Sequence, residues 1–320
     1  MADETGLMGF EFMREKQAAP QATPELGLSL PEYMAGVQER VGRRIADYLA
    51  ALPSDIRTEL SHSLISKKAN RIRPALTYMT GDTFGIPRTE LDDLALATEL
   101  VHTASLIFDD LPAQDDSDIR RGKEALHKKF GEGLAQNDGI ALLADAGNIL
   151  GGAESHREIS GQLSRSIWSR LGSRGMAQGQ RLDLKTFGRE PNEVTEKELD
   201  RITDLKTGQA IAMSIVGSAI IGELPDEIID ILKEYSYHAG IAYQVKDDLR
   251  DITATTEELG KPAGQDVKNQ RPTYYEVLGE QGCKDKIALH VAAALVALDR
   301  LPNDYNPIKF REIIEYFAAK

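Results

Sequence analysis

The chain of 320 residues has one cysteine, Cys283, and too little positive charge to offset its acidic residues, which leaves a formal net charge of −13. A single thiol excludes a disulfide framework and a cysteine-rich metal site. The acidic balance argues against a general nucleic-acid-binding protein, because such proteins meet the phosphate backbone with a basic surface. A polyanionic ligand would therefore need bound cations together with a local basic patch.

The sequence also lacks long apolar runs and sorting signals. Its longest apolar stretch, Ile211 to Gly222, is too short to span a bilayer. The N-terminus is acidic and shows neither the basic-then-apolar pattern of a secretory signal nor an arginine-rich transit pattern. We therefore expect a cytoplasmic protein that does not span the membrane.

Strand-like alternation is scarce, and no βαβ pattern, repeat or low-complexity linker is evident. Residues 1–30, rich in Ala, Pro, Gln and Glu, are predicted to form a mobile N-terminal arm. Residues 31–320 are predicted to form one all-α domain of ten or more helices. Helical spacing of apolar residues is clearest in five segments: Leu91 to Phe108, Glu198 to Ile221, Glu227 to Ile252, Cys283 to Leu301 and Lys309 to Ala319.

Two clusters of aspartates stand out within these apolar segments, where carboxylates are costly unless their charge is offset. They lie about 138 residues apart and comprise Asp109, Asp110 and Asp115 in the first cluster, and Asp247, Asp248 and Asp251 in the second. The i, i+1, i+4 spacing of the second cluster favours one face of a helix. In the first, a straight helix would turn Asp115 away from Asp109, so we expect Pro112 to break the helix and let the chain bend back. Two such clusters facing a cavity suit hard divalent cations and a phosphate ligand.

Basic residues flank both clusters. Single basic segments are most simply explained as solvated faces or as partners of nearby aspartates. Together with the aspartates, they form the mixture that a metal-diphosphate site requires, because arginine forks and lysines bind phosphate oxygens. The basic residues concerned are Lys67, Lys68, Arg71, Arg73, Arg120, Arg121, Lys123, Lys206, Lys261, Lys268 and Arg271.

The run from His102 through Asp109-Asp110-Leu-Pro-Ala-Gln-Asp115 to Arg120-Arg121-Gly-Lys resembles the first aspartate-rich motif of the trans-prenyltransferases. These are the isoprenyl diphosphate synthases that make farnesyl, geranylgeranyl and longer diphosphates. The run Tyr243-Gln244-Val-Lys-Asp247-Asp248-Leu-Arg-Asp251 resembles the second motif. Gly175-Met-Ala-Gln-Gly-Gln-Arg-Leu-Asp183 and Lys206-Thr207-Gly208 match in order between them. The resemblance covers about residues 30–320 and implies a single-domain isoprenoid-synthase helical bundle with a central active-site cavity.

The resemblance also implies residue roles. Asp109, Asp115 and Asp247 would bind Mg²⁺ directly, and Asp110, Asp248 and Asp251 would assist directly or through water. Three Mg²⁺ ions would bridge these groups to an allylic diphosphate. The residues implied for that diphosphate are Arg120, Lys206, Thr207, Gln244, Lys261 and Arg271, the last standing where a lysine is usual. The residues implied for isopentenyl diphosphate are Arg73, His102 and Arg121.

The implied reaction is ionisation of the allylic diphosphate, followed by attack of the isopentenyl double bond on the carbocation. Chain length should depend on the pocket floor one to two turns before Asp109, where Ala104 and Ser105 are both small. Small residues there favour a longer product, and geranylgeranyl diphosphate is the expected one. Met79, Phe108 and Val101 remain able to close the pocket.

One position departs from the family pattern near residue 70. The family usually reads Gly-Gly-Lys-Arg-x-Arg-Pro, whereas this chain has Asn70 where the lysine for isopentenyl diphosphate is expected. An uncharged amide should weaken that diphosphate's binding unless Lys67 or Lys68 reaches into the site.

Two alternatives follow. A class I terpene synthase would ionise an allylic diphosphate without isopentenyl diphosphate, but its second motif usually has Ser and Glu where this chain has Asp251 and Thr255. A regulatory subunit of a heteromeric prenyltransferase, or an acidic cation-binding helical protein, is the non-enzymatic reading. A degenerate subunit would be expected to lose metal-binding aspartates, and this chain has all six. A homodimer is expected from the resemblance alone.

Overall fold

The computed structural model describes residues 23–152, 159–253 and 271–318. Lys261 and Lys268, and most of the N-terminal arm predicted over residues 1–30, lie outside this described part. Within it, helices account for nearly all regular structure, so the all-α prediction is confirmed. The described strands are two residues each, β1 (Ile119–Arg120) and β2 (Lys123–Glu124), and they form one antiparallel pair.

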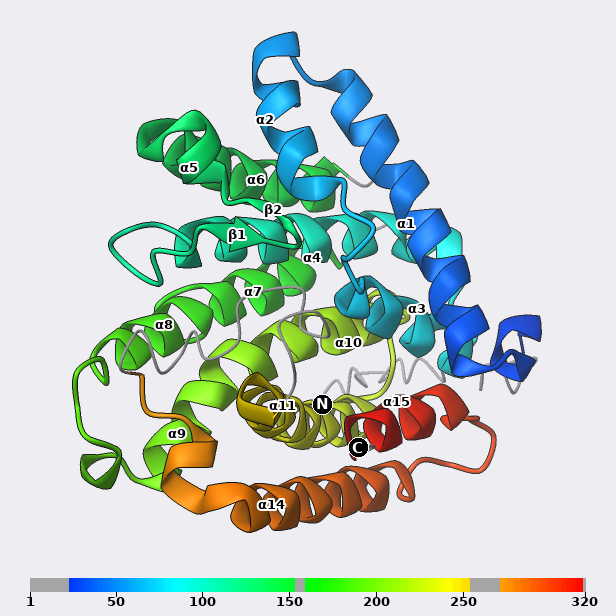
Figure 1. Cartoon of the computed structure of the whole chain (residues 1–320). Helices are drawn as coiled ribbons and strands as arrows, with labels where there is room; N and C mark the ends of the chain where they lie inside the picture. Colours follow the sequence, from blue (N-terminus) through cyan, green and yellow to red (C-terminus); the bar gives the residue numbers. More distant parts are fainter. Residues whose placement is uncertain (1–22, 153–158, 254–270, 319–320) are drawn as a thin grey trace, which may run out of the picture.

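The described helices are arranged as a bundle (Figure 1). Their bounds are η1 Pro24–Gly27, α1 Leu30–Ala51, α2 Ser54–Leu64, α3 Ile72–Phe84, α4 Arg88–Asp109, α5 Leu126–Phe130, α6 Glu132–Gly152, α7 Ser160–Leu171, α8 Met176–Leu184, η3 Pro191–Glu193, α9 Glu196–Thr203, η4 Asp204–Gly208, α10 Gln209–Ile221, α11 Asp226–Thr253, α14 Tyr274–Leu298 and α15 Ile308–Ala318.

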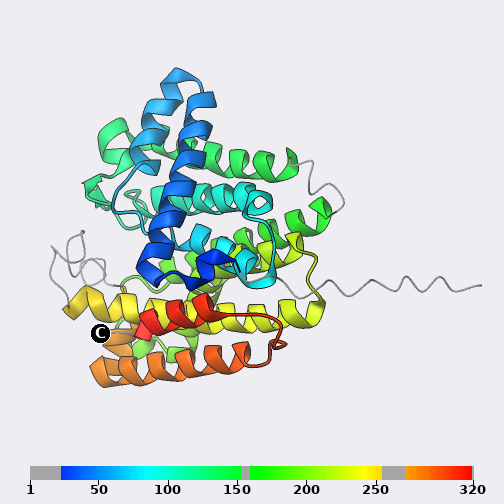
Figure 2. The same cartoon turned by 90° about the vertical axis from the view of Figure 1, so that its right-hand side faces the viewer.

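All five segments with helical apolar spacing are helical over most of their described residues. α14 ends at Leu298 rather than Leu301 and is kinked at Gly279 (φ +70°), and Ala319 lies outside the described residues. Two larger differences concern how the segments are divided and where they begin. The segment expected from Glu198 to Ile221 is not one uniform α-helix, because the π-helix η4 separates α9 from α10. α14 begins at Tyr274, nine residues before the expected start, because Thr273 caps it and pairs with Glu276 in a capping box. α11, α14 and α15 lie side by side (Figure 2).

α10 forms the centre of the core. Every residue from Ala210 to Ile221 is buried, and the helix packs against α3, α4, α7 and α11. A helix that is apolar all round must be enclosed by other elements, which explains why this stretch has no polar face. No helix in the described part of the chain combines the length and the apolar character that crossing a bilayer requires.

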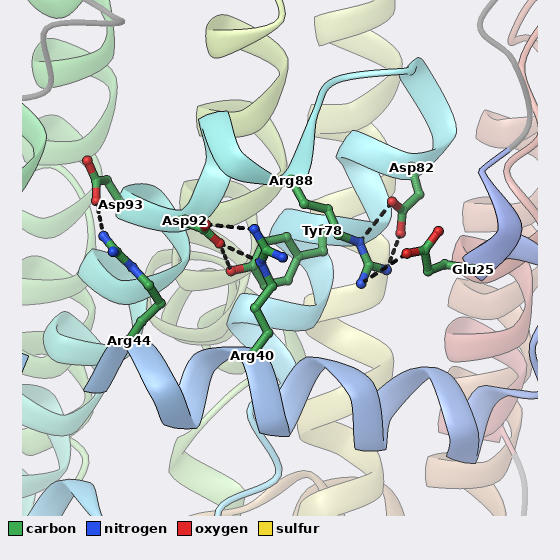
Figure 3. Close-up of polar contacts among 8 residues, drawn as sticks. All are labelled: Glu25, Arg40, Arg44, Tyr78, Asp82, Arg88, Asp92 and Asp93. Atoms are coloured by element: carbon green, nitrogen blue, oxygen red, sulfur yellow. Dashed lines mark hydrogen bonds and ion pairs between the residues drawn. The ribbon is translucent and has the colours of Figure 1, made fainter. Parts of the chain in front are cut away.

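Ion pairs join α1 to α4, and α4 to α3 (Figure 3). Both oxygens of Asp92 accept hydrogen bonds of 2.7 Å from Arg40, and the Tyr78 hydroxyl donates to the same carboxylate at 2.7 Å. Arg88 binds Asp82 in the same bidentate manner, at 3.0 and 2.6 Å. Bidentate pairs of this kind fix orientation as well as distance, so they set the position of α1 on the bundle.

The end of the expected N-terminal arm is packed against the bundle. Within η1, Leu26 is 7% exposed, and Glu25 lies 3.9 Å from Arg88. α1 then begins at Leu30, with Ser29 and Glu32 forming a capping box. Residues 24–30 therefore belong structurally to the helical domain.

A close backbone approach near the cavity joins η4 to α11 at two glycines. A Cβ atom at Gly240 would lie 2.7 Å from the Cα atom of Gly208 and 2.9 Å from its amide nitrogen. Because backbone atoms cannot move aside as a flexible side chain can, any side chain at Gly240 must separate the two helices. This contact places Lys206 and Thr207 of η4 beside α11.

We predict that Gly240→Ala lowers the free energy of unfolding by about 1–3 kcal/mol, because it overpacks this helix contact. Urea denaturation followed by circular dichroism measures the change. Gly42→Ala is the matched control: Gly42 is exposed on α1 and a Cβ there meets no atom within 4 Å, so helix propensity should raise stability by up to about 1 kcal/mol. Equal effects of the two substitutions would contradict the packing argument.

Candidate active site

A cavity of about 820 Å³ opens between α3, α4, α8, η4 and α11. Its polar wall contains most residues that the sequence singled out, namely Arg73, His102, Asp109, Asp115, Arg120, Lys206, Thr207, Gln244, Asp247 and Arg271. Its apolar wall is formed mainly by Val101, Leu106, Phe108, Leu143, Leu171, Met176 and Ala177. Residues from both aspartate clusters and from four separate basic segments therefore meet at one cavity.

The first aspartate cluster lies at a turn that ends α4. α4 stops at Asp109, and the chain folds back so that the amide of Asp115 donates to the Asp109 carbonyl oxygen at 2.9 Å. The amide of Asp116 donates to the Leu111 carbonyl at 3.1 Å within the same turn. The bend expected from Pro112 is thus confirmed, and both Asp109 and Asp115 line the cavity.

The three aspartates of the second cluster lie in different surroundings. Asp247 lines the cavity, whereas Asp248 is 7% exposed and Asp251 is 3% exposed, and neither belongs to the cavity wall. The Asp248 carboxylate accepts hydrogen bonds from the Gln244 amide at 2.8 Å and from the backbone amide of Tyr274 at 2.9 Å. Asp248 therefore orients Gln244 and holds the start of α14, and its assistance to a metal stays a prediction.

Burial raises the pKa of the Asp109 carboxyl, and the charges of Lys206 and Arg120 oppose that rise. No hydrogen bond or ion pair to this carboxylate is recorded among the described residues. A carboxylate that faces a cavity suits a hard divalent cation, because the cation would offset the cost of burying the negative charge. In the described part of the chain, no three His, Cys, Asp or Glu side chains are grouped closely enough to hold a metal ion. Water or ligand oxygens must therefore complete any metal shell built on Asp109, Asp115 and Asp247.

The cations around the aspartates are paired with protein carboxylates. The Nε atom of Arg120 donates to both oxygens of Asp110, at 2.9 and 3.1 Å. Burial raises the pKa of Asp110, and the positive charge of Arg120 opposes the rise. Asp110 is 3% exposed and lies outside the main cavity, so it holds Arg120 in the wall.

Asp183 of α8 is a site residue for which no role was predicted from the sequence. Lys206 forms an ion pair with it, and the Nε atom of Arg271 lies 3.5 Å from its other oxygen. Arg271 also donates to Asp115 at 2.6 Å. The signal was present in the motif ending at Asp183, but a motif does not reveal which cation its carboxylate will contact. On the opposite side of η4, Thr207 donates to Gln244 at 3.0 Å.

The residues expected at isopentenyl diphosphate are divided between two places. Arg73 and His102 line the cavity, and burial lowers the pKa of both side chains. For His102, the charges of Arg73 and Arg121 lower the pKa further, so the imidazole is neutral near pH 7. Arg121 lies outside the cavity wall and donates to Glu99 of α4 at 3.2 Å. Asn70 is exposed.

The apolar part of the cavity follows one face of α4. Val101, Ser105 and Phe108 line it at spacings of four and three residues, whereas Ala104 is fully buried in the core and does not. The ring of Phe108 packs against Gly139 of α6, where a Cβ atom would lie 2.6 Å from the ring. Of the two residues expected at the pocket floor, Ser105 faces the cavity and Ala104 does not.

Comparison with known proteins agrees with this geometry. A family model described as polyprenyl synthetase matches residues 54–293. A farnesyl diphosphate synthase from Bacillus subtilis (strain 168) is 31% identical over 271 residues, covering 83% of this chain and 90% of that protein. Geranylgeranyl pyrophosphate synthase 4 from Arabidopsis thaliana is 33% identical over 254 residues, covering 79% of this chain and 68% of that protein.

Solved structures give the same result. The apo structure of an FPP/GFPP synthase from Zymomonas mobilis has a TM-score of 0.78 at 27% identity, covering 91% of this chain and 99% of that one. A geranyltransferase from Legionella pneumophila has a TM-score of 0.78 at 28% identity, covering 90% and 96%. With three-quarters of its length inside the family model, and with the aspartate motifs and their cations gathered at one cavity, this chain belongs to the polyprenyl synthetase family, the trans-isoprenyl diphosphate synthases.

Proposed function

We propose that the protein condenses an allylic diphosphate with isopentenyl diphosphate, head to tail, to give a longer trans-prenyl diphosphate and inorganic diphosphate. One observation carries this proposal: a single cavity joins Asp109, Asp115 and Asp247 to Arg73, His102 and an apolar wall. An enzyme that only ionises an allylic diphosphate needs the aspartates and the apolar wall. It has no evident use for Arg73 and His102, which are half-buried in the cavity wall.

The aspartates and their cations support the ionisation step. Mg²⁺, three ions by resemblance, would supply Lewis-acid stabilisation of the departing diphosphate, with Asp109, Asp115 and Asp247 as its protein ligands. Lys206, Arg120 and Arg271 line the same cavity and add fixed positive charge. The allylic C–O bond breaks, its electron pair leaves with the diphosphate, and the remaining carbocation is delocalised over the allyl group.

Arg73 and His102 support the coupling step by holding the diphosphate of isopentenyl diphosphate, with Arg121 behind them. The double bond of this substrate attacks the allylic carbon and forms the new C–C bond. The resulting tertiary cation loses a proton from the neighbouring carbon to the departed diphosphate, which restores a double bond. No protein base is required, because the departed diphosphate accepts the proton.

Product length follows from the apolar wall. Ser105 leaves space between Val101 and Phe108 on the cavity face of α4, and that space favours geranylgeranyl diphosphate over farnesyl diphosphate. The curated relatives include makers of both products, so the wall residues of this chain are the basis for the choice. The homodimer and the cytoplasmic location stay predictions.

The test is product analysis of the full chain with Mg²⁺ and an allylic diphosphate, with and without isopentenyl diphosphate. Elongated diphosphate formed only when both substrates are present is the expected result. A hydrocarbon or alcohol formed from the allylic substrate alone would identify a terpene synthase. Absence of turnover with either mixture would favour a regulatory subunit.

Asp109→Asn is predicted to lower kcat by about 10²–10³-fold, because it removes a charged ligand from the position where metal and diphosphate meet. The Mg²⁺ concentration needed for half-maximal rate should rise in parallel. Asp55→Asn removes the same charge from an exposed position on α2 and should leave both quantities near wild type. A similar loss in both variants would show that only net charge matters.

Ser105→Phe is predicted to shorten the main product from geranylgeranyl to farnesyl diphosphate, because the ring would fill the space between Val101 and Phe108. Chromatography of the products after dephosphorylation measures the distribution. Ser105→Ala keeps the side chain small and should keep the wild-type distribution. An unchanged product in Ser105→Phe would place the pocket floor elsewhere.

A further inference from the structure

The binding site for isopentenyl diphosphate lacks one cation that the family pattern places at residue 70. Asn70 is exposed, uncharged and followed by Arg71, which is buried. Arg71 cannot substitute for the missing charge, because it forms an ion pair with Glu99 and donates to the carbonyl of Leu64. A replacement must come from a neighbouring residue of the same loop or from the facing hairpin.

The end of α2 and the first residue after it form hydrogen bonds with basic residues of the β1–β2 hairpin. The ammonium of Lys123 donates to the carbonyls of His62 and Ile65, at 3.1 and 2.5 Å. Arg121 donates to the carbonyl of Ser63 at 3.4 Å. These contacts hold residues 62–65 against the turn, so the lysines that follow are delivered to the same place.

Lys68 lies across the middle of that turn, at Gly122. A Cβ atom at Gly122 would lie 3.1 Å from the Lys68 Nζ atom and 3.2 Å from its Cδ and Cε atoms. Gly122 has a φ of +77°, which favours glycine, and its bare Cα leaves the path of the lysine chain open. The Lys68 ammonium therefore lies next to Gly122, the residue that follows Arg121 in the sequence. Among the described residues, no acceptor is recorded for it.

Positive charge at this place exceeds the negative charge available to balance it. Arg71 and Arg121 both pair with the one buried carboxylate of Glu99. The same positive charges act on His102. Its pKa is lowered first by burial and then by the charges of four arginines: Arg73, Arg121, Arg120 and Arg71. A diphosphate bound here would supply the negative charge that balances these cations.

We propose that Lys68, seated on Gly122 beside Arg121, supplies the cation for the isopentenyl diphosphate that Asn70 cannot. This inference rests on the proposed function and adds to it a binding residue displaced by two positions along the loop. The aliphatic stem on Gly122 limits the positions open to the ammonium, and so reduces the entropy lost on binding.

The test is steady-state kinetics of the full chain with each substrate varied in turn at a saturating level of the other. Lys68→Gln is expected to raise the KM for isopentenyl diphosphate about tenfold, the effect of one charge-assisted contact. The KM for the allylic diphosphate should change by less than about twofold. Lys197→Gln, which removes the same charge from an exposed position on α9, should leave both constants near wild type.

A second experiment moves the positive charge from residue 68 to residue 70. Asn70→Lys introduced into Lys68→Gln is expected to restore a low KM for isopentenyl diphosphate, because it returns the cation to the position that the family pattern uses. An unchanged KM in Lys68→Gln, an equal rise in Lys197→Gln, or failure of Asn70→Lys to restore binding would each overturn the role of Lys68. Turnover of the allylic substrate by wild type without isopentenyl diphosphate would instead refute the proposed function itself.

Discussion

The burial of the Asp109 carboxylate at the end of α4 is the constraint around which the cavity wall is arranged. Its pKa is raised by burial and lowered again by the charges of Lys206, Arg120 and Arg271, which come from three different segments of the chain. Without those cations, a charged side chain in this position would favour its neutral form and lose its affinity for a metal. The turn that bonds Asp115 to Asp109 then adds a second carboxylate within the same field.

The cations near the allylic end share a further property: each has its own carboxylate. Arg120 pairs with Asp110, Lys206 with Asp183, and Arg271 with Asp115. Such pairs hold long side chains in the wall while the cavity contains no anion, and they resolve the apparent conflict between a net charge of −13 and a polyanionic ligand. A cation that binds Asp115 must compete with Arg271 for the carboxylate. Metal binding would therefore leave guanidinium charge available to a diphosphate.

Local pattern was sufficient to predict the helices, the two aspartate clusters and the bend after Pro112, because each depends on residues within a few positions of one another. It was insufficient wherever the answer depended on which way a helix faces its neighbours. Ala104 and Ser105 are adjacent and equally small, yet α4 turns Ser105 to the cavity and Ala104 into the core. Asp248 is similarly directed away from the cavity, because the start of α14 offers it a backbone amide.

The position of the basic residues required the most information from distant parts of the chain. Asp183 forms an ion pair with Lys206, which is 23 residues further along the chain. Glu99 of α4 forms ion pairs with Arg71 and Arg121. Gly208 and Gly240 show why such placements are stable: contact between two bare backbones leaves η4 little freedom to shift along α11. The π-helical turn of η4 then directs Lys206 and Thr207 to the cavity, with Thr207 bonded to Gln244 of α11. Each of the two proposed diphosphate sites thus depends on a close contact at glycine: Gly240 against the backbone of Gly208 at one, and Gly122 against the side chain of Lys68 at the other.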